Sequence, residues 1–161
     1  VGGSRALMED LFDPRGGAKL SHGGTFNANP MTMVAGAAAM ELYDRPAHDR
    51  LASLGERLRA GLRDLLKVTG RPGTVTGAAS MVGFFHTGSP ITDYRSMLHT
   101  MMTDPSVGRL ANEFFRHMLN HGVYMANHGF MVLSTPMTEA DIDFILDKAE
   151  LSLRSMSAEA A

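Results

Sequence analysis

The sequence contains no cysteine, which excludes disulfide bonds and metal sites built on thiolates. This absence fits a reducing compartment, and we expect a cytoplasmic protein. Neither sign of charge is in excess, because 15 lysines and arginines stand against 17 aspartates and glutamates, giving a net charge of −2. A balanced surface offers no electrostatic argument for a nucleic acid or an anionic membrane as partner.

Long apolar runs are also missing, since no window approaches the roughly 18 consecutive apolar residues of a membrane-spanning helix. The sequence opens with Val1-Gly2-Gly3-Ser4 and resembles neither a signal peptide nor an initiator methionine. We therefore expect a chain that is entered partway through. What the sequence does contain suits a packed core, because 44% of its residues are hydrophobic and 20% are charged.

From position 46 onward, helical and extended patterns follow one another. Leucines three or four residues apart predict an amphipathic helix, and clusters of β-branched and aromatic residues predict strands. The predicted elements are a helix around 51–65, strands at 74–76 and 81–87, a helix over 106–121, strands at 123–126 and 130–134, and a last helix from Thr138. Residues 88–105 fit an irregular helix or a loop. This order predicts an α+β domain over residues 46–161, with helices packed on one side of a mainly antiparallel sheet.

Residues 1–45 have a different character. Asn29 and Pro30 predict a helix start, because asparagine caps helices well and proline suits the first helical position. Between Met31 and Met40 no residue is charged, and five consecutive residues are Ala or Gly. A helix that is apolar on every side is normally buried. We therefore expect a partner surface to cover it and place a domain boundary between residues 45 and 46.

The stretch from position 22 to 30 reads HGGTFNANP. A glycine-rich turn exposes backbone N–H groups that can converge on an anion, and the Thr25 hydroxyl adds a donor. Gly23 and Gly24 supply such backbone. On residue types alone, the alternative is an ordinary loop before a helix, in which the glycines only provide positive φ angles.

The longer segment SHGGTFNANPMTMVAGAAAMELYD resembles the part of class III aminotransferases that follows their lysine-bearing strand, most closely in the branch of glutamate-1-semialdehyde 2,1-aminomutase. VGGSRALMEDLFDP, GVYMA and GFMVLSTPMTEADIDFILDKAE resemble further segments of this family in the same order. The resemblance implies an α/β enzyme of fold type I that binds pyridoxal 5′-phosphate (PLP) at a homodimer interface. Residues 1–45 would end its large domain, and residues 46–161 would form its small C-terminal domain.

The same resemblance implies roles for single residues. Gly24 and Thr25 would bind the phosphate of PLP across the dimer interface. Phe26 and Asn27 would line the entrance or hold the turn. His22 and His128 are further candidates for the substrate cleft.

One essential residue of such an enzyme has no counterpart here. The family needs a lysine that forms a Schiff base with PLP, and Lys19, Lys67 and Lys148 do not stand where the family places it. We therefore expect no catalytic residue in this chain and dependence on an N-terminal portion of the same enzyme. Two departures count against naming glutamate-1-semialdehyde as substrate: the short Asn127-His128 turn, and the lack of arginine between Arg116 and Arg154.

The resemblance implies amino-group transfer between a small-molecule donor and a carbonyl acceptor. Racemisation or aldol cleavage on the same scaffold stays open, because a fold does not fix a reaction. So does a non-catalytic remnant that serves as an interaction or dimerisation module. His117 and His121 lie one helical turn apart, but the pattern implies no third ligand, and we expect no metal site.

Overall fold

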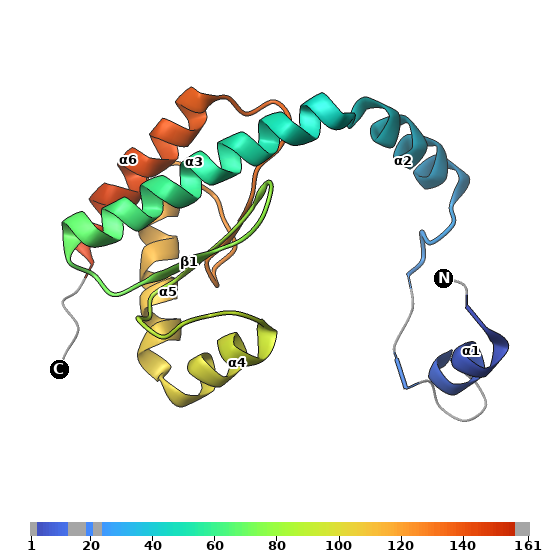
Figure 1. Cartoon of the computed structure of the whole chain (residues 1–161), viewed down its shortest axis with the longest axis horizontal. Coiled ribbons are helices and arrows are strands. Elements are labelled where there is room, and N and C mark those ends of the chain that lie inside the picture. Colours follow the sequence, from blue (N-terminus) through green and yellow to red (C-terminus); the bar gives the residue numbers. More distant parts are fainter. Residues whose placement is uncertain (1–2, 13–18, 21–23, 157–161) are drawn as a thin grey trace. The chain divides into compact units, whose positions relative to one another are not determined.

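The computed structural model describes residues 3–12, 19–20 and 24–156 (Figure 1). The chain divides into two compact units, Val1–Asp44 (unit 1) and Arg45–Ala161 (unit 2).

Unit 1 contains two helices, α1 (Arg5–Phe12) and α2 (Pro30–Leu42). Helix α2 begins as the sequence predicts: the Asn29 side chain accepts a hydrogen bond from the Met31 amide at 3.0 Å, and Pro30 is the first helical residue. No residue of α2 is buried. Its exposed apolar side chains are Met31, Met33, Val34, Met40 and Leu42. Within the described residues of unit 1 nothing covers the helix, and the partner surface stays a prediction.

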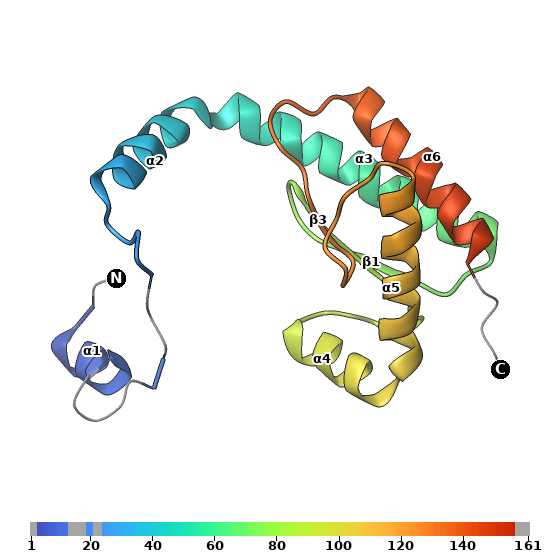
Figure 2. The ribbon, with the colours of Figure 1, turned by 180° about the vertical axis from the view of Figure 1, so that it is seen from behind.

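Unit 2 is an α+β body, as the sequence predicts (Figures 1 and 2). Its elements are α3 (Arg45–Thr69), β1 (Thr74–Thr76), β2 (Met81–Phe85), α4 (Tyr94–Thr103), α5 (Pro105–Asn120), β3 (Phe130–Val132) and α6 (Glu139–Ser155). The three strands form one antiparallel sheet in the order β1-β2-β3. Gly83 in the central strand lies opposite both Thr76 and Phe130.

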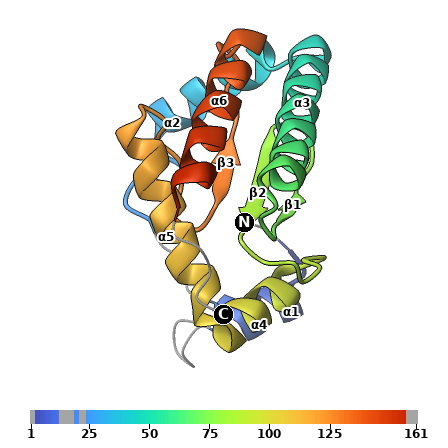
Figure 3. The same cartoon turned by 90° about the vertical axis from the view of Figure 1, so that its left-hand side faces the viewer.

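The core of unit 2 lies between its helices and one face of the sheet. Helix α6 packs against α3 and against α5, and Figure 3 shows these helices side by side. A row of apolar side chains at helical spacing is buried against this core in each of α3, α5 and α6. The rows are Leu51, Leu54, Leu58 and Leu62 in α3, Leu110, Phe114 and Met118 in α5, and Ile142, Ile145, Ala149 and Leu153 in α6. Burying one such large side chain contributes about 1.5–3 kcal/mol relative to exposure, so these rows hold unit 2 together.

One predicted strand is wrong. Residues 123–126 form no strand, although Val123 and Met125 are buried. The Val123 amide donates to the Met118 carbonyl at the end of α5, and the Ala126 amide donates to the Phe130 carbonyl. Buried and more exposed residues alternate here as in a strand, but no regular ladder of backbone hydrogen bonds joins residues 123–126 to a neighbouring segment. The ambiguous stretch 88–105 contains α4, whose first turn is capped by the Asp93 carboxylate.

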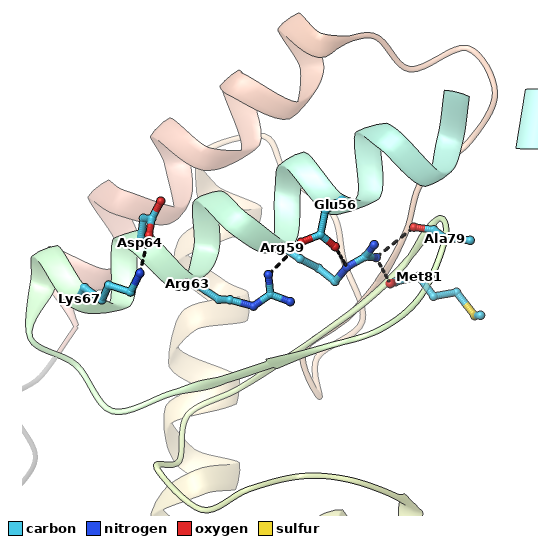
Figure 4. A network of polar contacts seen from close by, with 7 residues as sticks. All are labelled: Glu56, Arg59, Arg63, Asp64, Lys67, Ala79 and Met81. Atoms are coloured by element: carbon cyan, nitrogen blue, oxygen red, sulfur yellow. Dashed lines mark hydrogen bonds and ion pairs between the residues drawn. The ribbon is translucent and has the colours of Figure 1, made fainter. Parts of the chain in front are cut away.

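A polar network fixes the turn between β1 and β2 to α3 (Figure 4). The buried Arg59 side chain donates to the Ala79 carbonyl at 3.0 Å and to the Met81 carbonyl at 2.9 Å. Its Nε donates to Glu56 at 3.0 Å. A Cβ atom on Gly55 would lie 1.9 Å from the Ala79 carbonyl oxygen. Glycine at position 55 therefore lets the turn approach the helix closely.

A candidate phosphate-binding turn

The residues from Gly24 to Asn29 form two successive reverse turns that lead into α2. The Asn27 amide donates to the Gly24 carbonyl at 3.2 Å, and the Asn29 amide donates to the Phe26 carbonyl at 3.2 Å. Asn29 then caps the helix. The turns thus end at the amino end of α2, where the helix dipole favours an anion.

Gly24 has a conformation that other residues rarely adopt. Its φ angle is 155°, and a Cβ atom there would lie 2.8 Å from Oδ1 of Asn27. The Asn27 amide group therefore occupies the space that a side chain at position 24 would need. The turn therefore requires glycine at position 24, because a side chain there would meet Asn27 and would need a φ angle that it rarely adopts.

The residues that carry the hydrogen-bond donors of this turn are exposed to solvent. Gly24, Thr25, Phe26 and Asn27 are all exposed, and the Phe26 side chain is 72% exposed. The backbone N–H groups of Gly24 and Thr25 and the Thr25 hydroxyl are short, neutral donors of the kind that bind phosphate. The residues present therefore fit a phosphate group. His22 and Gly23 lie outside the described residues.

His128 belongs to unit 2, in the turn before β3. Its ring stacks on that of Phe130, with centroids 6.4 Å apart and planes 4° from parallel, and its Nδ1 lies 3.4 Å from the Asn127 side-chain oxygen. Gly129 anchors the turn, because its carbonyl accepts a hydrogen bond from the Phe84 amide at 2.9 Å. The candidate residues 24–27 therefore share one turn, whereas His128 lies in a separate unit.

The lysines have other interactions in this chain. Lys19 pairs with Asp10, Lys67 pairs with Asp64 at 2.8 Å, and the Lys148 ammonium lies 5.0 Å above the Phe144 ring. All are surface contacts.

The two histidines at metal-ligand spacing make hydrogen bonds within unit 2. The His121 ring donates through Nδ1 to the His117 carbonyl at 2.7 Å, and His117 lies 3.3 Å from the Ser155 hydroxyl. Across residues 3–12, 19–20 and 24–156, no three metal-ligating side chains gather in one place. None of the helices in these ranges is both long and apolar enough to span a bilayer.

Comparison with known proteins gives a consistent set of relatives, although no family model matches the chain. The chain is 42% identical over 142 residues to beta-phenylalanine transaminase of Variovorax paradoxus, covering 88% of this chain and 31% of that protein. It is 34% identical over 154 residues to glutamate-1-semialdehyde 2,1-aminomutase of Akkermansia muciniphila, covering 94% of this chain and 34% of the relative. The chain thus spans about a third of the length of these curated relatives.

Solved structures give the same result. An omega-transaminase from Sphaerobacter thermophilus superposes with a TM-score of 0.74 at 37% identity, covering 95% of this chain and 34% of that chain. The beta-phenylalanine aminotransferase from Variovorax paradoxus superposes with a TM-score of 0.67 at 39% identity, covering 93% and 33%.

Proposed function

This chain belongs to the class III aminotransferases and matches a C-terminal portion of their fold type I architecture, and we propose that it is part of a PLP-dependent enzyme that transfers an amino group from a donor to a carbonyl acceptor. In this proposal unit 1 is the end of the large domain and unit 2 is the small domain. The observation that carries the proposal is the exposed turn at Gly24 and Thr25, whose donors stand at the amino end of α2.

The turn would hold the phosphate of PLP. The amides of Gly24 and Thr25 and the Thr25 hydroxyl would donate to its oxygens, and a hydrogen bond to such a charged group contributes about 1.5–3 kcal/mol. Asn27 would keep the Gly24 backbone in place, because its side chain lies against that residue. Phe26 and His22 would border the cleft. When bound, PLP supplies an electron sink for carbanion chemistry.

The rest of the enzyme would supply what this chain lacks. A lysine that binds PLP covalently, an acidic partner for its pyridine nitrogen and an aromatic stacking residue would come from the N-terminal portion. Helix α2 supports a homodimer, because its apolar side chains are exposed in this chain and a contiguous apolar surface of this kind marks an interface. His128 would face the small-molecule amino donor or acceptor from the small domain.

Thr25→Ala in the assembled enzyme tests the phosphate contact. Loss of one charge-assisted hydrogen bond should weaken PLP binding by roughly tenfold or more. Thr25→Ser keeps the hydroxyl and should bind PLP like the wild type. Thr135→Ala is the matched control, because that residue is also exposed and lies in unit 2.

The measurement is a titration with PLP followed by the visible absorbance of the bound cofactor. Equal affinities of Thr25→Ala and wild type would refute the assigned phosphate contact. A wild-type assembly that binds no PLP, or that binds it without moving amino groups from donor to acceptor, would refute the proposed function itself.

A further inference from the structure

His86 is a buried histidine whose ring has an unsatisfied nitrogen. It follows β2 and is only 4% exposed. Its ring meets that of Phe84 edge-on at 4.9 Å and that of Phe114, on α5, at 5.1 Å. Among the residues that the structure describes, none makes a hydrogen bond with its Nε2 atom. Buried polar atoms are normally paired, so this nitrogen requires an explanation.

Two charged side chains act on the ring from different elements. Arg71 lies between α3 and β1, and Glu113 lies on α5. The Arg71 guanidinium also holds the end of α6, because it donates to the Leu153 carbonyl at 2.6 Å and to the Met156 carbonyl at 2.5 Å. Burial, followed by the nearby Arg71 charge, lowers the pKa of His86 to about 4, and Glu113 opposes this shift.

We propose that His86 is an acid-sensitive switch for the carboxyl end of α6. At neutral pH the ring is uncharged and fills the apolar space between Phe84 and Phe114. A proton on the ring would place a positive charge in this space, where no described group accepts a hydrogen bond from Nε2. The nearby Arg71 guanidinium would repel that charge, and Glu113 would offset only part of the cost. The structure relieves this charge by releasing the contacts of Arg71 with the last turn of α6.

The direction of the pH effect follows from the two protonation states. In the released state the ring is accessible to water and titrates near its ordinary pKa of about 6.5. In the closed state it stays neutral down to a pH of about 4. Between these values the released state binds more protons, so acid favours it, by up to about tenfold per pH unit. Above this window the switch has no effect.

Cysteine labelling detects the release, because the sequence has no cysteine of its own. Ser152 is fully buried near the end of α6 and differs from cysteine by one atom. In a Ser152→Cys variant we expect the thiol to be protected at neutral pH and to react increasingly as the pH falls toward 4. A pyridyl disulfide reagent that works in acid is suitable. Ser53→Cys on the exposed face of α3 corrects for the reagent's own pH dependence.

The decisive comparison adds His86→Phe to both cysteine variants. Phenylalanine fills the same apolar space and cannot take a proton, so the acid-dependent reactivity of the thiol at position 152 should disappear. His99→Gln, which removes an exposed histidine, should leave it unchanged. The proposal is overturned if the thiol at position 152 stays protected to pH 4, or if it becomes equally reactive with phenylalanine at position 86.

A second measurement does not depend on a variant at position 86. The imidazole signals of His86 in the wild-type protein can be followed by NMR through the same pH range. We expect no protonation until the acid end, where the signals of the last turn of α6 change together with it. Titration of His86 near its ordinary pKa of about 6.5, with α6 unchanged, would overturn the proposal.

Discussion

Substituting Gly55 by alanine is expected to destabilise unit 2, although alanine is the better helix former. Gly55 lies in α3 and is buried against the turn before β2. An added Cβ atom would lie 1.9 Å from the Ala79 carbonyl oxygen, whereas Cβ atoms essentially never come closer than 3.0 Å to a neighbour. The atom that it meets belongs to the backbone, so the helix and the turn must separate by about 1 Å or more.

The magnitude follows from what this separation disrupts. The Ala79 carbonyl accepts a hydrogen bond from the buried Arg59 guanidinium at 3.0 Å, and Met81 accepts another at 2.9 Å. Each hydrogen bond to a charged group contributes about 1.5–3 kcal/mol. Replacing glycine by alanine in a helix returns about 1 kcal/mol. If one of the two bonds is lost and the packing loosens, we expect a net destabilisation of about 1–3 kcal/mol.

Urea denaturation followed by circular dichroism measures the effect as a shift in midpoint at unchanged slope. Two glycines in helices of the same unit serve as matched controls. A Cβ on Gly108 meets nothing within 4 Å, so Gly108→Ala should stabilise the protein by about 0.5–1 kcal/mol. A Cβ on Gly61 meets only the flexible end of Leu146, so Gly61→Ala should have a smaller effect than Gly55→Ala. If Gly55→Ala stabilises the protein as much as Gly108→Ala does, the close approach of turn and helix is refuted.

Two further variants test the core and the cap of α6. Phe114→Ala should destabilise the protein by about 3–5 kcal/mol in thermal or urea unfolding, because the Phe114 side chain is only 1% exposed. Phe144 is 45% exposed, so Phe144→Ala should cost less than about 1 kcal/mol. Similar losses for the two variants would contradict the assigned core. The backbone amide and hydroxyl of Thr138 donate to the Asp141 carboxylate and lower the pKa of Asp141 below 3.8. This carboxylate therefore stabilises the fold above its unfolded pKa and ceases to do so as acid protonates it. Asp141→Asn should lower the melting temperature at neutral pH, with a difference from wild type that shrinks in strong acid; a difference that does not change with pH would contradict the capping contact.

Residue types alone predicted only part of the candidate phosphate site. The glycine, threonine and asparagine content of positions 24–29 predicts donor-rich backbone before a helix, and the structure has a turn there with a cap at Asn29. The proximity of the Asn27 side chain to Gly24 could not be predicted from residue types, because it depends on the positive φ angle of that glycine. Phosphate binding by Gly24 and Thr25 stays a prediction.

The sequence alone determined the periodic parts of unit 2. Leu58 and Leu62, Phe114 and Met118, and Ile142 and Leu153 recur at helical spacing, and each pair faces the core. Such spacing can be recognised in the sequence because a helix repeats every 3.6 residues and puts equivalent positions on one face. Caps at Asn29 and Thr138 are equally local, since the groups that they pair lie within three residues.

Tertiary structure alone decided features that join distant segments. Residues 123–126 alternate like a strand, but strand pairing depends on a neighbour, and their backbone hydrogen bonds to Met118, Gly129 and Phe130 form no regular ladder. The surroundings of His86 are set by Phe114 and Arg71, and the turn at Ala79 is fixed by Arg59, 20 residues earlier. Spacing along the chain carries no information about such contacts, because they form only when separate elements pack together.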